Sequence, residues 1–206
     1  MIKKILVFNA ILLIGSFTYA LPASETLAKK LNSVITFSSD FTQTVEDDHG
    51  QILQKSTGHM QFNRPLLFYW HTDSPHPQTL WYRKHELVIY DQRLQQATIK
   101  KVSTTIDPNL LPLMLLTGNP IQVLQHFTVT ETNGDYTLKP TRDDSGLLIG
   151  VLLKMTPNSS IEKIEYQTNL GQKTIINFSH ADVNKPLNQR LFFERIPLGV
   201  DIVAVE

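Results

Sequence analysis

The chain has 206 residues, no cysteine, and 19 basic against 19 acidic side chains, so its formal net charge is zero. A neutral chain has no electrostatic basis for binding nucleic acid, which excludes that class of function. The lack of cysteine excludes disulfides and cysteine-bound metals, so an apolar core must stabilise the fold.

The first 20 residues have the pattern of a secretory signal peptide. Lys3 and Lys4 precede an apolar run from Ile5 to Phe17, and the stretch ending at Ala20 is a small-residue cleavage site. The run is shorter than the roughly 20 residues that a membrane-spanning helix needs. We predict cleavage after Ala20 and export of residues 21–206 as a single domain, with a net charge of about −2 because two of the 19 basic residues are removed.

The exported part begins with one amphipathic helix and continues as a series of strands. Leu27, Leu31 and Val34 recur at helical spacing, and Ser24 is the expected N-cap. After the helix, strand-like stretches separated by turn signals recur about every ten residues, which is typical of an antiparallel meander. We expect these strands at residues 37–46, 51–62, 66–72, 78–82, 86–91 and 95–102.

The strand expected at 66–72 is apolar on both faces. In an extended chain Leu66, Phe68 and Trp70 share one face, and residues 67, 69 and 71 share the other. A sheet with one face in water needs apolar residues on one face only. Both faces of this strand therefore require cover, or one of them lines an apolar cavity, and the pattern alone does not decide which.

The segment 107–127 breaks the strand rhythm and predicts two short helices. Asp107-Pro108 is a helix start, and Pro112 keeps the first helix short or kinked. Gly118 ends this helix and Asn119-Pro120 starts the second. Because residues 109–116 are apolar on nearly every side, the helix that they form must be covered on most sides.

Strands resume after the helices and predict a mainly β fold. About ten or eleven antiparallel strands in one domain should curl into an incomplete, half-open β-barrel, with the short helices as a lid over its mouth. The later strands are expected at residues 128–132, 136–140, 147–156, 161–168 and 172–178, with further strand-like pieces at 191–194 and 196–201.

No group of residues predicts catalysis or a metal site. His71, His76 and His85 lie close in the sequence, but no histidine pair has helical i, i+4 spacing. The acidic residues 46–48 adjoin a turn glycine and are typical of a solvated loop. No nucleophile elbow, phosphate loop or dinucleotide fingerprint occurs, so we expect neither a cofactor nor enzymatic activity.

Arg64 is the charged residue of most interest. It precedes Pro65, which favours an extended backbone at the preceding residue, and its five donors adjoin an apolar strand. From these residues alone, an exposed arginine at a strand end is the simpler interpretation.

Five motifs occur in order along the chain: Phe41-x-Gln43-x-Val45, Gly58 to Phe62, Arg64-Pro65-x-x-Phe68-x-Trp70, Tyr90-Asp91-x-x-Leu94-x-Gln96 and Phe193-x-x-x-Pro197-x-Gly199-Val200-Asp201. Together they resemble the outer-membrane lipoprotein carrier family LolA. The family usually has a glycine turn where this chain has Arg83-Lys84-His85, so the geometry of this hairpin is not predicted.

The resemblance implies a periplasmic carrier, expected to be a monomer. It would take acylated lipoproteins from an ATP-driven inner-membrane release complex to a lipid-anchored receptor on the outer membrane. It also implies that Arg64, in the Arg-Pro motif, latches the lid by hydrogen bonds from inside the cavity. Strand alternation and the apolar helix give the expected cavity lining: Met60, Phe62, Leu66, Phe68, Trp70, Leu110, Leu111, Met114 and Leu115.

Two alternatives remain from the sequence. The outer-membrane receptor, with a similar fold, would carry a lipid-modified cysteine after its signal peptide, where this chain has Leu21. A secreted β-barrel hydrolase, or another protein that binds apolar ligands, is the second alternative. A hydrolase would need a polar triad or carboxylate pair in the cavity, whereas these strands supply mostly apolar side chains.

Overall fold

A computed structural model describes residues 21–83, 85–102, 111–141 and 148–205. The predicted signal peptide, the Asp107-Pro108 helix start and Leu110 lie outside the described residues. In chain order the elements are α1 (Ala23–Ser33), β1 (Thr36–Glu46), β2 (Ile52–Asn63), β3 (Leu67–Ser74), β4 (Gln78–Arg83), β5 (Glu86–Asp91), β6 (Gln96–Lys101), α2 (Leu111–Thr117), α3 (Pro120–Leu124), β7 (Phe127–Thr132), β8 (Asp135–Pro140), β9 (Leu148–Met155), β10 (Ile161–Thr168), β11 (Lys173–Val183), the 3-10 helix η2 (Gln189–Phe193) and β12 (Asp201–Val205).

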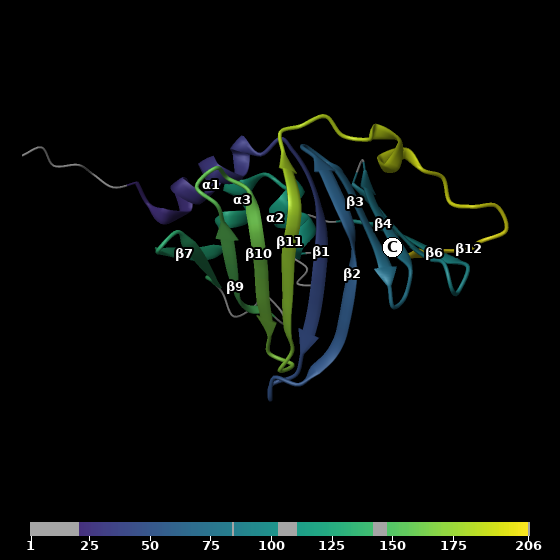
Figure 1. Cartoon of the computed structure of the whole chain (residues 1–206), viewed down its shortest axis with the longest axis horizontal. Helices are drawn as coiled ribbons and strands as arrows, with labels where there is room; N and C mark the ends of the chain where they lie inside the picture. The colour runs from purple at the N-terminus through teal and green to yellow at the C-terminus, as the bar shows by residue number, and fades with distance from the viewer. Residues whose placement is uncertain (1–20, 84, 103–110, 142–147, 206) are drawn as a thin grey trace, which may run out of the picture.

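The strands form one open sheet. Their order is β12-β6-β5-β4-β3-β2-β1-β11-β10-β9-β8-β7, so β7 and β12 are its two edges and the described part of the chain does not close a barrel (Figure 1). Strand β1 pairs with both β2 and β11 and thereby joins the N-terminal meander to the C-terminal one. Neighbouring strands are antiparallel except for β12, which pairs in parallel with β6.

One face of the sheet packs against the three α-helices. Residues of α1, α2 and α3 share a single buried apolar cluster, the helix-side cluster, with residues of β1, β2 and β8 to β11. Phe37 and Phe62 of neighbouring strands stack at 5.5 Å within it. Helix α2 lies against β2 and β3, and α1 lies against α3 and β7. The helices therefore cover the concave side of the open sheet (Figure 1).

The other face of β3 to β6 is covered by the C-terminal segment. Tyr69, Trp81 and Val88 lie on this face and form a second cluster, the tail-side cluster, with Phe192 of η2, which is 1% exposed. Figure 1 shows this segment, in yellow, passing from β11 over the sheet to β12. Of the two alternatives for the strand at 66–72, the structure shows the first, because both of its faces are covered.

Three local predictions were wrong. Pro22, not Ser24, caps α1, because the Pro22 carbonyl accepts from the amides of Glu25 and Thr26, both at 3.0 Å. Strand β3 begins at Leu67, since Leu66 has a φ of 74° and lies in the turn before it.

The third error concerns the tail. The strand-like piece at 191–194 is mostly the 3-10 helix η2, which begins where the Asn188 side chain accepts from the amide of Arg190. The last strand starts only at Asp201, and it raises the number of strands to 12.

Candidate functional site

Helices α2 and α3 bury their apolar side chains against the strands. Leu115 and Leu116 of α2 are 1% and 0% exposed, and Val123 and Leu124 of α3 are also buried. The Asn119 side chain begins α3 by accepting from the amide of Ile121 at 3.0 Å, which confirms the predicted start. The sides of these helices that face the sheet are buried. A ligand could therefore reach the apolar interior between helices and sheet only if the helices moved aside.

The residues predicted to line a cavity divide into three groups. Met60, Phe62, Phe68 and Leu115 are buried members of the helix-side cluster. Leu66 and Trp70 are partly buried and pack against it, and Met114 is half-buried in α2. The third group is not placed: the side chain of Leu111 and the whole of Leu110 are outside the described part of the structure. The structure thus gathers Met60, Phe62, Phe68 and Leu115 in one apolar interior.

Gly58 permits a close aromatic stack in this interior. The rings of Phe41 and Trp70 stack with centroids 3.7 Å apart. A Cβ atom at position 58 would collide with the carbonyl oxygen of His71 and lie 2.8 Å from the Phe41 ring. Only glycine allows strand β3 and the Phe41 ring to approach β2 this closely.

Arg64 joins the β2–β3 turn to the end of α2. Its Nη1 atom donates to the Gly118 carbonyl at 2.6 Å, and Nη2 donates to the Leu115 carbonyl at 3.1 Å. The last carbonyls of a helix lack partners within the helix and carry its negative dipole end, so a guanidinium satisfies them well. The guanidinium also lies 5.4 Å from the Phe62 ring centroid.

Burial sets the electrostatics of Arg64. Desolvation lowers the pKa of Arg64 to about 10, so the side chain keeps its charge at neutral pH. Its Nε atom is buried and has no hydrogen-bond partner among the described residues. The simpler interpretation from the sequence, an exposed strand-end arginine, is wrong, because Arg64 is half-buried and bonded to Leu115 of α2, which is 51 residues away in the chain.

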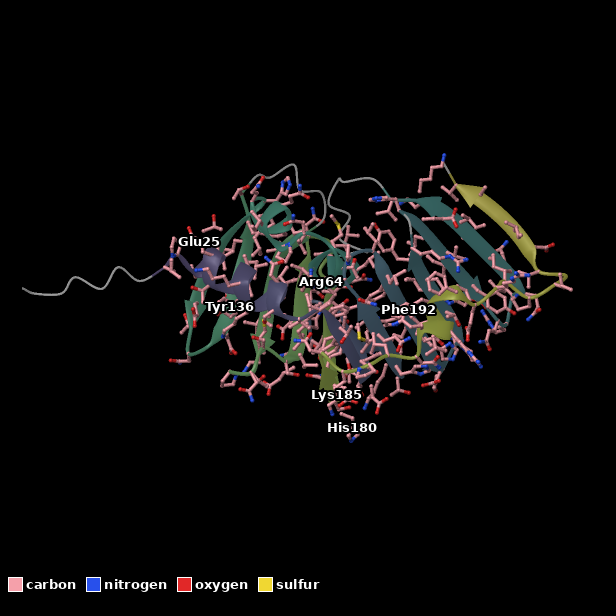
Figure 2. The ribbon with its side chains drawn as sticks, turned by 90° about the horizontal axis from the view of Figure 1, so that it is seen from above. Glu25, Arg64, Tyr136, His180, Lys185 and Phe192 are labelled. Carbon is pink, nitrogen blue, oxygen red and sulfur yellow. The ribbon has the colours of Figure 1, made fainter. Side chains whose placement is uncertain are left out.

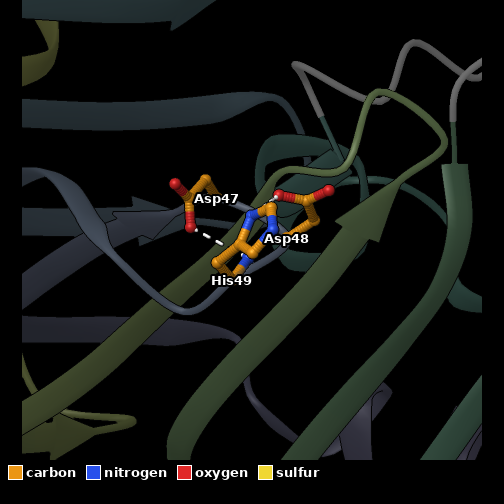
Figure 3. A group of neighbouring side chains, drawn as sticks. All are labelled: Asp47, Asp48 and His49. Carbon is orange, nitrogen blue, oxygen red and sulfur yellow. Dashed lines mark hydrogen bonds and ion pairs between the residues drawn. The ribbon is translucent and has the colours of Figure 1, made fainter.

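The described residues offer one group with the spacing of a metal site: Asp47, Asp48 and His49 in the β1–β2 hairpin (Figure 3). The Asp47 carboxylate already accepts from the backbone amides of His49 and Gln51. Asp48 and His49 are exposed and pair with each other. This geometry is that of a turn held by its own aspartate, as the sequence indicated for the acidic loop.

The histidines considered from the sequence have other contacts. His71 Nδ1 lies 2.8 Å from the Thr79 hydroxyl, and its Nε2 lies 3.4 Å from the Asp73 carboxylate. Burial lowers the pKa of His71, while Asp73 opposes this shift. His76 and His85 belong to no metal-like group among the described residues.

Sequence reasoning missed the residues that hold the C-terminal segment. Trp81 Nε1 donates to the Leu191 carbonyl at 3.0 Å, Arg83 Nη1 to the Phe192 carbonyl at 3.2 Å, and Gln61 Nε2 to the Asn188 carbonyl at 2.9 Å. The available signal was the pair of apolar faces at 66–72 together with the Phe192-Phe193 pair near the end of the chain.

Among the described residues, no helix is long and apolar enough to span a membrane. A family model described as "Outer membrane lipoprotein carrier protein LolA" matches residues 32–194. A protein from Chromohalobacter salexigens, named outer-membrane lipoprotein carrier protein, is 31% identical over 208 residues, covering 95% of this chain and 97% of that protein. A protein of the same name from Pseudomonas putida is 33% identical over 183 residues, covering 87% of this chain and 85% of that protein.

A solved structure shares the fold at low identity. An uncharacterised conserved protein from Thermus thermophilus has a TM-score of 0.54 and 8% sequence identity, and the match covers 88% of this chain and 97% of that one. At that identity the likeness concerns the fold alone.

Proposed function

We propose that this chain, which belongs to the LolA family of outer-membrane lipoprotein carriers, is a periplasmic chaperone that shields the acyl chains of lipoproteins. The observation that carries the proposal is the apolar interior between the concave face of the sheet and helices α2 and α3. Membership in a family of carriers also confirms the prediction that the chain is not an enzyme.

The energetics of acyl chains explain why such an interior is useful. Each methylene group removed from water contributes about 0.8 kcal/mol, so one long acyl chain left in water costs on the order of 10 kcal/mol. A carrier must therefore cover the chains completely. It must also release them to a membrane, so its interior cannot hold them much more strongly than lipid does.

Closing helices α2 and α3 over the empty interior contributes a free energy similar to that of burying an acyl chain. Five of their side chains are buried in the helix-side cluster: Leu113, Leu115, Leu116, Val123 and Leu124. At roughly 1.5–3 kcal/mol for each buried side chain, the closed lid gains on the order of 10 kcal/mol, as an upper estimate. This is close to the value for one acyl chain. Closing the empty lid can therefore drive cargo out.

Arg64 acts as the latch of this lid. Its two hydrogen bonds to α2 and the turn after it are charge-assisted, and each contributes about 1.5–3 kcal/mol. That is a fraction of the apolar contribution. The latch therefore adjusts the balance between the open and closed lid, while apolar contacts supply most of the affinity for cargo.

For the finer steps we propose the transfer route that the resemblance to the family implies. Acylated lipoproteins would be received from an ATP-driven release complex in the inner membrane and passed to a lipid-anchored receptor on the outer membrane, with the chain acting as a monomer.

The test uses the purified mature chain and an apolar dye whose fluorescence reports burial. A diacylated lipopeptide should displace the dye, and the same peptide without acyl chains should not. Leu124→Asp should weaken both ligands because it places a charge in the helix-side cluster, whereas Ile121→Asp, at a 58% exposed position of the same helix, should not. Independent binding of dye and lipopeptide would contradict the proposal.

A further inference from the structure

Tyr136 has a buried hydroxyl without a partner. It lies on β8, opposite Glu131 of β7 and Leu153 of β9, and it is 0% exposed. The hydroxyl oxygen makes no hydrogen bond with any described residue. Figure 2 shows Tyr136 near α1, in the half of the molecule away from Phe192 and the C-terminal segment.

An orphaned tyrosine hydroxyl is unusual. A tyrosine in a protein interior normally places its hydroxyl against a hydrogen-bond partner, because burying an unpaired polar group is unfavourable. Lys30 of α1 contacts Tyr136 differently, since its Nζ atom lies 5.2 Å from the ring centroid. A cation over the ring interacts with the π-electrons and leaves the hydroxyl proton free.

A second tyrosine shows that the same interior can satisfy a hydroxyl. Tyr166 of β10 also packs against the helix-side cluster, Thr174 lies opposite it on β11, and the Tyr166 hydroxyl is not among the buried atoms without a partner. Tyr136 belongs to the same cluster, but its buried hydroxyl has no hydrogen-bond partner among the described residues.

The unpartnered atoms of the described interior have one chemical character. They are the Tyr136 hydroxyl and Arg64 Nε, and both can donate a hydrogen bond. Tyr136 belongs to the same cluster as the lid side chains, and Arg64 lies over Phe62 of that cluster. A bound molecule that is mainly hydrocarbon and carries hydrogen-bond acceptors would satisfy these donors.

We propose that the Tyr136 hydroxyl donates a hydrogen bond to a carbonyl oxygen of an acyl linkage in the bound lipid. An ester carbonyl joined to a long chain combines the acceptor and the hydrocarbon that the site requires. The inference rests on the proposed carrier function and adds a specificity-determining residue to it: the interior distinguishes acyl chains from plain alkyl chains. Tyr136 is the better residue to test, because changing Arg64 would also remove the latch.

The experiment compares two ligands and three proteins. The ligands are a diacylated lipopeptide with ester linkages and its dialkyl ether analogue, which has chains of equal length but no ester carbonyls. The proteins are the mature wild type, Tyr136→Phe and the matched control Tyr166→Phe. Wild type should bind the ester form about 2- to 10-fold more tightly than the ether form, the effect of one neutral hydrogen bond.

Tyr136→Phe should abolish this preference by weakening only the ester form, and Tyr166→Phe should keep it. Thermal unfolding gives an independent reading of the empty protein: Tyr136→Phe should not lower the midpoint, because the hydroxyl that it removes has no partner among the described residues. A loss of stability in Tyr136→Phe would mean that the hydroxyl is already satisfied and would overturn the inference.

Equal binding of both ligands by the wild type, or a preference that survives in Tyr136→Phe, would also overturn it while leaving the carrier function intact. If the wild type binds neither ligand, the carrier function itself fails and the inference fails with it.

Discussion

Replacing Arg64 with leucine should slow the delivery of cargo while leaving loading intact. The change removes two charge-assisted hydrogen bonds, to the carbonyls of Gly118 and Leu115, which together contribute about 3–6 kcal/mol to the closed lid. A leucine at this position recovers about 1.5–3 kcal/mol through apolar contact with the interior. At the midpoints of these two ranges, the closed lid is then less favourable by about 2 kcal/mol, which favours the open lid roughly 30-fold.

The assay loads the variant with a lipoprotein and presents it to membranes that carry the outer-membrane receptor. Because the empty closed state no longer competes with cargo as strongly, release should slow by up to the same factor, and loading should remain at least as efficient as in the wild type. Hydrogen exchange at the backbone amides of α2 should increase in the empty variant, since the lid opens more often.

Two further variants give this test its controls. Arg93→Leu removes a charge from an exposed turn and should transfer cargo normally. Arg64→Lys keeps the charge but cannot donate to two carbonyls in the planar geometry of a guanidinium, so its transfer rate should be intermediate. Transfer at the wild-type rate by a folded Arg64→Leu protein would refute the latch.

Three other predictions concern the sheet and its covers. Phe192→Ala should lower the free energy of unfolding by about 3–5 kcal/mol, whereas Phe193→Ala, at a 54% exposed position, should change it little. Equal losses of the two variants in denaturant unfolding would contradict the packing of η2 against the sheet through Phe192. Gly58→Ala should be strongly destabilising because its Cβ meets the His71 carbonyl and the Phe41 ring, while Gly150→Ala, whose nearest neighbour is 3.5 Å away, should be tolerated; circular dichroism melting curves distinguish the two. Burial, followed by the charges of Glu194 and Asp73, raises the pKa of Tyr69 from 10.0 to about 12. The fold therefore favours neutral Tyr69, and the stability that this preference contributes is lost as pH rises from about 10 to about 12. Wild type should lose more stability over that range than Tyr69→Phe, and parallel losses would show that Tyr69 does not contribute.

The sequence could predict those features that depend on neighbouring residues. The unbroken apolar run from Leu67 to Trp70 indicated that both faces need cover or that one lines a cavity, and Asn119-Pro120 marked the start of α3, because both are local patterns. The pairing of β12 with β6 joins residues about 100 positions apart, and no local pattern encodes it. The same reason explains Arg64: its neighbours in sequence suggested exposure, and its partners Leu115 and Gly118 are brought to it only by the folded chain.

The orphaned hydroxyl of Tyr136 could not be predicted for a related reason. The sequence predicted a strand at residues 136–140, and in the structure Tyr136 lies at a buried position of β8, where buried and less buried residues alternate. Whether a buried hydroxyl finds a partner depends on which side chains the other strands and helices bring within about 3 Å of it. For the Tyr136 hydroxyl, the described residues bring no such partner.

The two covers of the sheet are attached in different ways, and this difference indicates which of them moves. The C-terminal segment is tied to the sheet by hydrogen bonds from Gln61, Trp81 and Arg83, and it is bounded by paired strands on both sides, β11 and β12. Among the described residues, α2 and the turn after it are hydrogen-bonded to the sheet through Arg64 of the β2–β3 turn. Displacing the C-terminal segment would break several polar bonds and a strand pairing. Displacing α2 and α3 breaks the two Arg64 bonds and exposes apolar surface that an acyl chain can cover again. A ligand that is mainly hydrocarbon therefore opens the helix side of the sheet at a far lower cost in free energy than the tail side.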